Sequence, residues 1–553
     1  MDVLSPWLLA LAPAALLVVG LVPDRLANRH PGRMVAALGI AALTAVGVAG
    51  TAALALAVHG GPWSVALGGA GLGPGLYYDT LTAVLMLLVA VLGLVVVRYS
   101  GPYLDGDPRQ GTFLRWMALT LAAVLTLIVS GSLLQFVVAW VATSLALHQL
   151  LVFYRDRPLA RLAARKKAIV SRLGDVALVL ALLLTWQTFG TLAFADLFAA
   201  AETMRAEGTI PAAAGWIAGL LVVGAVVKSA QVPVHGWLTE VMETPTPVSA
   251  LLHAGVINAG GVLILRLADL VTLSATAMAV LAVIGAATAL IGAVVMLTQT
   301  SIKVALAWST IAQMGFMMLQ CGLGAFSAAL LHIVAHSFYK AHAFLSAGSV
   351  VDRARAAVAP AAAGATAPAP AGRVALALGL AVAASAVVAT LFGHAVTASP
   401  GVFTLIAVLA LGVTLLLVPL LAPGVPAAVR LRAGALAVAV LAAYAAVQSG
   451  AAVLLAGTLP PPEQSAGAFE AGLAAVVIAA FAAVVLLQTR LPALARDPRW
   501  QAVQVHLANG LYLNAHASRI AQRLWPLPPA PAPARADTAP VAPLSVGQEA
   551  PSS

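Results

Sequence analysis

Charged residues are scarce in this chain of 553 residues, in which Asp, Glu, Lys and Arg together make up 9% of the sequence. Soluble domains contain about 25%, so the composition excludes an ordinary soluble enzyme. Cysteine is almost absent, since Cys321 is the only one. An intrachain disulfide and a Cys-ligated iron–sulfur cluster each need several thiolates, so we expect neither here, and no cofactor.

Hydrophobic residues make up 62% of the sequence and gather in runs bounded by charges, proline or glycine. Apolar runs of about 20 residues cross a bilayer as helices. The sequence therefore predicts an all-α, polytopic membrane protein of about 13–15 transmembrane helices. The candidate helices lie near residues 6–23, 34–57, 77–98, 113–129, 131–153, 169–189, 213–242, 247–270, 273–297, 302–320, 325–350, 372–393, 400–421, 431–455 and 467–489.

The chain carries a net charge of +10, from 29 Lys and Arg against 19 Asp and Glu. These basic residues occupy short loops rather than one continuous face, so membrane topology explains them better than nucleic-acid binding does. Counting from an N-terminus outside, most basic loops and the C-terminus fall on the cytoplasmic side. Arg205 and Arg266 are exceptions, because both fall near the outer side. The first apolar run lacks a preceding basic segment, so we expect a retained helix rather than a signal peptide.

Three segments lie outside the expected spans. Residues 353–372 are an Ala/Pro-rich linker, and 526–553 are a Pro/Ala/Ser-rich tail expected to be disordered. Residues 491–525 read as a cytoplasmic amphipathic helix. Its apolar positions Val503, Leu507, Leu511, Ile520 and Leu524 lie opposite Arg519, Gln522 and Arg523. This helix either anchors the chain at the interface or binds a soluble partner through Arg519 and Arg523.

Charged groups inside a bilayer are costly and therefore mark candidate functional sites. Lys228 follows the apolar run LLVVGAVV, and Pro233 interrupts the backbone bonding of the same expected helix. A buried lysine can lose its proton and regain it when a counter-charge moves closer, which suits a group that loads and unloads protons. The alternative is a permanently charged lysine with a structural partner.

Four further titratable residues fall within expected spans. His253 lies in the range 247–270, and His332, His336 and Lys340 recur at four-residue steps, which places them on one helix face about 6 Å apart. Imidazole both donates and accepts protons, so this stripe predicts a proton pathway. No cluster of carboxylates or thiolates accompanies the histidines in the sequence, so we expect no metal site.

Two charged residues near span ends are ambiguous. Lys303 lies at the inner boundary, where it either contributes to the pathway or extends toward the lipid headgroups. Asp175 and Arg172 are three residues apart and can form an ion pair along a helix. We favour Asp175 as a counter-charge to Lys228.

Four segments contain most of these polar positions: SRLGD at 171–175, KSAQVPVHGWLTEVMETPTPVSALLHAGV at 228–256, SIKVALAWSTIAQMGFM at 301–317 and HIVAHSFYKAHAFLSAGSV at 332–350. They resemble the proton-translocating, antiporter-like subunits shared by NADH-quinone oxidoreductase, as its L chain, and Mrp cation/proton antiporters. The resemblance implies two inverted five-helix repeats, each with a broken helix and a central lysine. It matches Lys228 to the first repeat's lysine, His253 to the bridging histidine, and Lys303, His332, His336 and Lys340 to the second repeat's polar axis.

The resemblance also implies a division of the chain. The units are N-terminal transmembrane helices at 1–110, a first antiporter-like repeat at 111–270, a second, divergent repeat at 271–425 that includes the linker, C-terminal transmembrane helices at 426–490, the amphipathic helix at 491–525 and the tail at 526–553.

The chain departs from the family pattern at three places. The family's Trp-Glu, whose glutamate modulates the channel lysine, is replaced by Trp140 and Val141. No lysine follows Lys340, so the second repeat lacks its broken-helix lysine, for which His394 is a conceivable substitute. The long lateral helix of the respiratory L chain is not evident. A standard respiratory subunit is therefore not expected.

These departures, TSLALHQLL at 143–151 and the ending VHLANGLYLNAHASRIAQRLWP resemble membrane subunits of DAB inorganic-carbon accumulation complexes. That resemblance implies a partner, DabA, which is a large cytoplasmic zinc protein similar to carbonic anhydrase. It implies a transporter subunit of the cell inner membrane that passes protons or sodium to drive conversion of CO2 to bicarbonate, with the zinc on the partner. The alternatives are an antiporter-like subunit of a respiratory, hydrogenase or Mrp complex, and a structural scaffold with a decayed channel.

Overall fold

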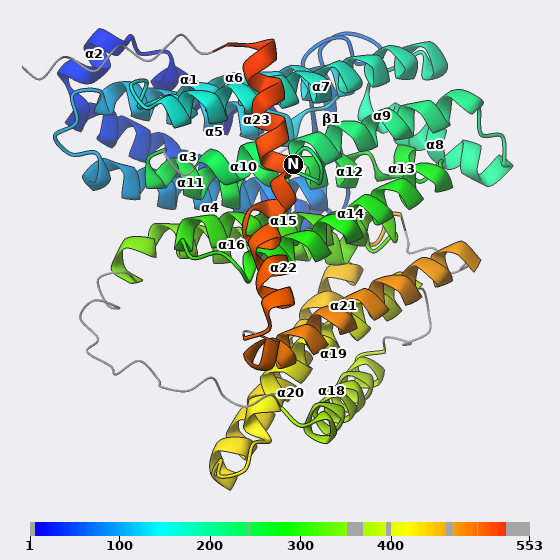
Figure 1. Ribbon diagram of the computed structural model, residues 1–553. Coiled ribbons are helices and arrows are strands. Elements are labelled where there is room, and N and C mark those ends of the chain that lie inside the picture. The colour runs from blue at the N-terminus through cyan, green and yellow to red at the C-terminus, as the bar shows by residue number, and fades with distance from the viewer. Residues whose placement is uncertain are drawn as a thin grey trace, which may run out of the picture.

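The computed structural model describes residues 6–241, 244–350, 369–393, 400–460, 468–494 and 496–526. The tail beyond residue 526, His394 and the linker up to residue 368 lie outside these residues. Within the described ranges the chain is a polytopic, all-α protein with one small β-hairpin (Figure 1). The predicted fold class is confirmed.

The helices follow the apolar runs of the sequence. They are η1 (Pro6–Ala10), α1 (Leu11–Gly20), α2 (Asp24–Arg29), α3 (Pro31–His59), α4 (Thr80–Tyr103), α5 (Gln110–Val129), α6 (Leu133–Leu151), α7 (Pro158–Phe189), α8 (Phe194–Glu207), α9 (Ala212–Lys228), α10 (Gly236–Glu240), α11 (Thr246–Ala254), η3 (Val256–Asn258), α12 (Ala259–Arg266), α13 (Ala268–Val271), α14 (Ala275–Met296), α15 (Ile302–Gly322), α16 (Phe326–Leu345), α18 (Ala371–Leu391), α19 (Pro400–Leu420), α20 (Ala427–Leu454), α21 (Ala468–Leu494), α22 (Pro498–Ala508), η4 (Gly510–Tyr512) and α23 (Leu513–Leu524).

Every predicted range contains a helix, and 12 of the described helical segments are long and apolar enough to cross a membrane. Two apolar segments, Pro6–Gly20 and Ala212–Lys228, are shorter. The remaining predicted range contains α16, a helix of 20 residues that carries three histidines and Lys340. The chain is therefore a multi-pass membrane protein.

Three local elements differ from the prediction. Strands β1 (Trp63–Ala66) and β2 (Gly75–Tyr78) form an antiparallel hairpin, in which Trp63 pairs with Tyr78 and the two rings stack 5.4 Å apart. Helix α8 was not expected, because it is too short and too polar to register as a span. The eighth expected helix is interrupted at Gly255, which has φ −119° and ψ −79° and separates α11 from η3 and α12.

Helices α14 and α15 pack closely because glycine occupies their contact. A Cβ atom on Gly285 would lie 2.4 Å from the backbone nitrogen of Leu319, and one on Gly315 would lie 2.4 Å from that of Ala289. Small residues let membrane helices approach at backbone distance. This packing fixes α15, which supplies polar partners to the candidate site.

Arg205 and Arg266, the two arginines expected near the outer side, are both neutralised by carboxylates. Arg266 forms an ion pair with Asp79, with Nη1 and Oδ2 2.7 Å apart. Arg205 forms one with Asp269 at 3.2 Å. Because each arginine is paired with a carboxylate, neither one argues against the predicted orientation.

The C-terminal helices α22 and α23 cross in front of the main bundle in Figure 1. The single amphipathic helix expected here is wrong, because Gly510, Leu511 and Tyr512 all have positive φ and split it in two. Ile520 and Leu524 are 57% and 67% exposed, whereas the small residue Ala521 is buried.

Candidate functional site

Lys228 is the last residue of α9, at the point where the helix breaks. The break is held by hydrogen bonds to two other helical segments, η3 and α14. The Ser229 hydroxyl donates to the carbonyl oxygen of Ile257 at 2.8 Å, and the Val232 N–H donates to Oγ1 of Thr288 at 3.1 Å. These bonds satisfy backbone groups that the interrupted helix leaves open, which is the condition for irregular backbone at membrane depth.

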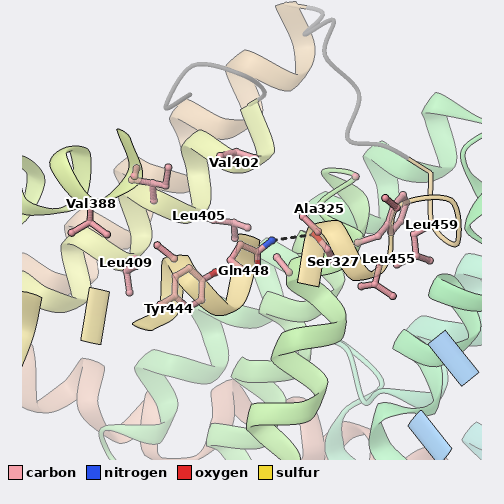
Figure 2. Close-up of a pocket in the computed structure, with 18 of the residues that line it drawn as sticks. Ala325, Ser327, Val388, Val402, Leu405, Leu409, Tyr444, Gln448, Leu455 and Leu459 are labelled. Carbon is pink, nitrogen blue, oxygen red and sulfur yellow. Dashed lines mark hydrogen bonds between the residues drawn. The ribbon is translucent and has the colours of Figure 1, made fainter. Parts of the chain in front are cut away.

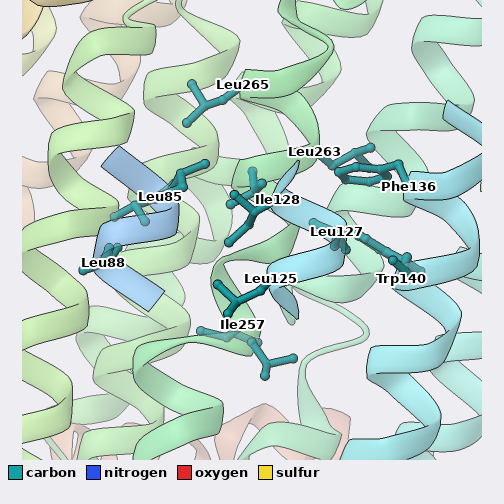
Figure 3. Close-up of a cluster of buried hydrophobic side chains, with 14 of the residues drawn as sticks. Leu85, Leu88, Leu125, Leu127, Ile128, Phe136, Trp140, Ile257, Leu263 and Leu265 are labelled. Carbon is teal, nitrogen blue, oxygen red and sulfur yellow. The ribbon is translucent and has the colours of Figure 1, made fainter. Parts of the chain in front are cut away.

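The Lys228 ammonium points toward α6. Its Nζ donates to Oγ of Ser144 at 2.8 Å and lies 4.3 Å from the centre of the Trp140 ring. Trp140 belongs to the apolar cluster shown in Figure 3, together with Phe136 and Leu263. Among the described residues, no carboxylate forms a salt bridge with Lys228. A hydroxyl and an aromatic face therefore contact the Lys228 ammonium.

Lys167 is a second buried lysine at this site, and the sequence reasoning missed it. It is 3% exposed, and its Nζ donates to the backbone carbonyl of the same Ser144 at 2.8 Å. In the sequence it follows a run of basic residues and reads as part of a cytoplasmic loop. Only the length of α7, which has 32 residues, could have indicated that Lys167 lies inside the bundle.

Asp175 forms its ion pair with Arg172, one turn away on α7, with Nη2 and Oδ2 2.7 Å apart. It also lies within electrostatic range of both Lys228 and Lys167. The predicted i, i+3 pair is confirmed. The role of Asp175 as a counter-charge to Lys228 stays a prediction, and any such effect acts through space rather than by contact.

His253 is completely buried just before the break at Gly255. Its ring stacks on Phe344 at 4.3 Å, and its Nδ1 lies 3.1 Å from Oγ1 of Thr310. The Thr310 hydroxyl already donates to the carbonyl of Leu306. Its oxygen therefore accepts from Nδ1–H of His253, which assigns the tautomer and leaves Nε2 as a proton acceptor with no partner among the described residues.

The histidine stripe on α16 forms as predicted. The rings of His332 and His336 lie 6.1 Å apart, and Lys340 follows one turn further along. His332 Nδ1 is 3.0 Å from Oε1 of Gln320, whereas both ring nitrogens of His336 lack a partner in the described part of the chain. The Lys340 ammonium donates to Oγ of Ser309 at 2.7 Å.

The amide of Asn258 and the hydroxyl of Ser337 lie between the Lys228 region and α16. A cavity of about 30 Å³ borders Lys228, Asn258 and Ser337. Nδ2 of Asn258 donates to Oγ of Ser337 at 2.9 Å, and Oδ1 of Asn258 is buried without a partner among the described residues. A water needs roughly 10–15 Å³ and polar neighbours, so this cavity can hold one. The cavity and this hydrogen bond therefore lie between Lys228 on α9 and Ser337 on α16.

Two further residues lie at the edge of this axis. Lys303 is half-buried, and its Nζ is 3.4 Å from Oγ1 of Thr246. His235 lies in the segment 228–256 but was not predicted as a site residue. It is completely buried, and its ring lies 4.9 Å from that of Trp308. Both ring nitrogens of His235 lack a hydrogen-bond partner among the described residues.

A larger cavity lies apart from the titratable residues. Its volume is about 430 Å³, and its walls come from α16, α18, α19 and α20, with Leu405, Leu409 and Tyr444 among the lining residues (Figure 2). Nε2 of Gln448 donates across one side of it to Oγ of Ser327 at 3.1 Å. No lysine or histidine lines this cavity, so it is not a segment of the polar axis. Within the described residues no group of three or more His, Cys, Asp or Glu could hold a metal ion.

The C-terminal helix is tied to the residue next to Lys167. Lys166 forms an ion pair with Glu240 of α10 and donates to Oδ1 of Asn514 at 2.7 Å and to Oγ of Ser518 at 2.9 Å. Nδ2 of Asn514 in turn donates to Glu240 at 2.6 Å. A polar face of α23 therefore packs on the bundle, which leaves Arg519 and Arg523 exposed.

Replacing Glu240 by Gln should loosen α23, because Lys166 would lose its carboxylate while remaining buried. We expect faster trypsin cleavage after Arg519 and Arg523 in the folded protein, measured by mass spectrometry of timed digests. Asp497→Asn is the matched control, since Asp497 caps α22 rather than α23. Equal cleavage rates in Glu240→Gln and the unaltered chain would contradict this role.

Two family models match the chain. One is described as "NADH:quinone oxidoreductase/Mrp antiporter, TM" and matches residues 130–362, and the other as "NADH-Ubiquinone oxidoreductase (complex I), chain 5 N-terminus" and matches residues 63–114. The chain is also 40% identical, over 446 residues, to the "Probable inorganic carbon transporter subunit DabB2" of Halothiobacillus neapolitanus. This match covers 81% of the chain and 80% of that protein. The chain belongs to the DabB family.

Respiratory and antiporter proteins are related to this DabB-family chain over a smaller part of their length. The chain is 37% identical to NADH-quinone oxidoreductase subunit L of Mycobacterium tuberculosis over 320 residues, which are 57% of the chain and 50% of that protein. The structure of the Mrp complex from Dietzia sp. DQ12-45-1b matches with a TM-score of 0.59 and 25% identity, over 93% of this chain and 60% of the matched one. Its antiporter-like fold is confirmed.

The missing lysine in the second half of this DabB-family chain is accompanied by a difference in helix structure. Helix α9 breaks at its lysine, whereas α18 runs without interruption from Ala371 to Leu391 and contains no lysine. An apolar, unbroken helix needs no polar group to satisfy its backbone. Among the described spans, α9 is the one that breaks at a lysine, and in the second half the lysine and histidines of the stripe lie on the unbroken helix α16.

His336 offers a sharp test of the stripe in this DabB-family chain. His336→Ala should lower proton flux through the reconstituted protein by about 100-fold, the lower end of what a positioned acid–base group contributes. His342→Ala is the matched control, because His342 lies on the same helix but is exposed and off the stripe. Flux is read from a pH-sensitive dye inside proteoliposomes. Equal flux in the two variants would remove His336 from the pathway.

Proposed function

We propose that this chain is the membrane subunit of an inorganic-carbon accumulation complex in the cell inner membrane. In this proposal it conducts protons, or sodium, down their gradient and so drives a cytoplasmic DabA-like zinc protein that converts CO2 to bicarbonate. The observation that carries the proposal is the buried polar axis from Lys228 to Lys340, in a chain that matches a DabB2 protein over most of both lengths. The chain itself is a transporter subunit, and the catalytic zinc is assigned to the partner.

The axis is suited to protons because its groups exchange them through nitrogen. Lys228 alternates between ammonium and amine, and its neutral partners Ser144 and Trp140 stabilise the charge without trapping it in a salt bridge. A water beside Asn258 passes the proton between α16 and Lys228. His253 and His332 each present an Nε2 acceptor there, and Lys340 exchanges the proton beside Ser309. Lys303 and Asp175 act at the margins, as inner-side lysine and counter-charge.

The proposed orientation places the N-terminus outside and the C-terminus in the cytoplasm, where α23 meets the partner. Arg519 and Arg523 are exposed on α23 beside the exposed apolar side chains of Ile520 and Leu524. Such a mixed surface suits an acidic partner with an apolar centre. The lipid interface is the competing occupant of this face. The division into repeats at 111–270 and 271–425 belongs to the same proposal.

Growth of a carbonic-anhydrase-deficient bacterium in ordinary air tests the function. The strain expresses this chain with and without the proposed partner, a large soluble DabA-like protein encoded by a neighbouring gene. An uncoupler serves as control. Rescue that needs both proteins and disappears with the uncoupler supports the proposal. If both proteins assemble and no rescue occurs, the function belongs instead to the antiporter class, which the Mrp-like fold favours as the second candidate. Sodium-dependent rescue that resists the uncoupler would assign sodium as the ion.

A further inference from the structure

Two consecutive lysines on α7 point in different directions. Lys166 faces Glu240 and the C-terminal helix, whereas Lys167 faces the interior and donates to the carbonyl of Ser144. Lys228 donates to the hydroxyl of the same Ser144. Both interior ammonium groups therefore meet one residue of α6, from two different helices.

The surroundings of this lysine pair hold little negative charge. Among the described residues neither Lys167 nor Lys228 forms a salt bridge, and the acid within electrostatic range of both, Asp175, is engaged by Arg172. Two ammonium groups in one buried site repel each other. The pair is therefore favoured when it holds one proton rather than two, and that proton can reside on either nitrogen.

We propose that Lys167 is a second proton-exchanging residue of the pathway and passes protons between Lys228 and the cytoplasmic side. The inference rests on the proposed proton conduction through Lys228. In the exchange, the Lys228 ammonium gives its proton to the neutral amine of Lys167, so Lys228 becomes neutral, Lys167 becomes charged, and the pair keeps one positive charge. Ser144 lies between the two nitrogens, with its hydroxyl on Lys228 and its backbone carbonyl on Lys167. In the proposed exchange the hydroxyl relays the proton, since it can accept from one nitrogen and donate to the other.

The position of Lys167 supports this direction of transfer. Helix α7 begins at Pro158, which follows the basic segment assigned to the cytoplasmic side, and Lys167 lies between that end and the level of Lys228. Val141 stands where the family pattern has a glutamate. Ser144 lies one turn further along α6 and accepts hydrogen bonds from both lysines. The pair therefore fills the place where the family pattern has a lysine and a carboxylate.

A purely structural Lys167 makes a different prediction from a proton-exchanging one. If its only role is to hold the Ser144 carbonyl with a positive charge, arginine can replace it. If it must release a proton, arginine fails, because a guanidinium stays charged in proteins. Lys167→Arg therefore separates the two roles, and it does so without removing the charge.

The test is proton flux into proteoliposomes that contain the full chain, driven by an imposed pH gradient and read with a trapped dye. The variants are Lys167→Met, Lys167→Arg, Lys228→Met and, as a control on the same helix, Arg161→Met. Thermal melting in detergent reports folding. We expect Lys167→Met and Lys167→Arg both to lose about 100-fold in flux, with Arg161→Met unchanged.

Two results would overturn the inference. One is normal flux in Lys167→Met while Lys228→Met has none, which leaves the proposed pathway in place without Lys167. The other is normal flux in Lys167→Arg with loss in Lys167→Met, which assigns Lys167 a structural role. Normal flux in Lys228→Met would instead remove the proposed function on which the inference rests. If Lys167→Met does not fold, the charge-preserving Lys167→Arg decides alone.

Discussion

Lys228→Met should abolish gradient-driven carbon accumulation while the complex still assembles. Methionine fills a similar volume in the apolar site beside Trp140, so packing survives, but it can neither hold nor release a proton. Rescue of the carbonic-anhydrase-deficient strain should fall to the level of the empty vector. Co-purification of the partner measures assembly.

Lys228→Arg is the companion variant. It keeps the positive charge next to Ser144 and removes the exchange, because the guanidinium does not deprotonate. We expect it to be inactive as well. Full rescue by either variant would mean that Lys228 is not the proton carrier, and full rescue by arginine alone would mean that it acts only as a fixed charge.

Asp79→Asn should lower the stability of the fold by about 3–5 kcal/mol, the usual cost of leaving one member of a buried ion pair without its partner. Arg266 is buried, and its Nη1 and Nη2 donate to the two carboxylate oxygens of Asp79 at 2.7 and 3.0 Å. The backbone N–H of Thr82 donates to the same carboxylate at 2.8 Å. The variant should melt at a clearly lower temperature in detergent.

The chain supplies its own control for this prediction. Arg205 and Asp269 form the other outer ion pair, with side chains 40% and 24% exposed. Exposed pairs contribute about 0–1 kcal/mol, so Asp269→Asn should change the melting temperature little. The double variant Asp79→Asn with Arg266→Leu should recover part of the loss. Equal melting temperatures in Asp79→Asn and Asp269→Asn would contradict the argument.

The same ion pair gives a pH dependence. Asp79 precedes the α4 span, and burial alone would raise its pKa, but Arg266 and the Thr82 hydrogen bonds outweigh burial and hold the pKa below its ordinary value. A carboxyl with a lowered folded-state pKa contributes stability that is present above its unfolded-state pKa and is lost as the pH falls through the folded-state value. The Asp79 contribution should therefore be lost as the pH falls below the ordinary pKa of an aspartate, which melting in detergent at decreasing pH would measure.

The sequence indicated the spans and the histidine stripe because both follow from one-dimensional spacing. Apolar runs mark helices, and a four-residue step brings His332, His336 and Lys340 to one face whatever surrounds them. The break at Lys228 was also readable, since Pro233 follows closely. The break at Gly255 was not, because a glycine within an apolar run is compatible with a continuous membrane helix.

The contacts between distant segments could not be read from spacing. Lys167 looked like a loop residue because its neighbours are basic, and only the packing of α6 against α7 brings it to Ser144. The docking of the C-terminal helix was unreadable for a related reason. Its apolar spacing predicted an amphipathic segment but not which side packs on the bundle, where Lys166 and Glu240 present a polar surface that binds Asn514 and Ser518.

The most direct measurement of the central claim is bicarbonate formation in proteoliposomes that contain this chain together with its soluble partner. A proton gradient is imposed across the vesicle membrane at a fixed CO2 concentration. We expect bicarbonate to rise above its equilibrium level on the partner's side, to return to equilibrium with an uncoupler, and to stay at equilibrium in Lys228→Met. Bicarbonate that reaches only equilibrium with the gradient in place, or exceeds it equally in Lys228→Met, would contradict the account.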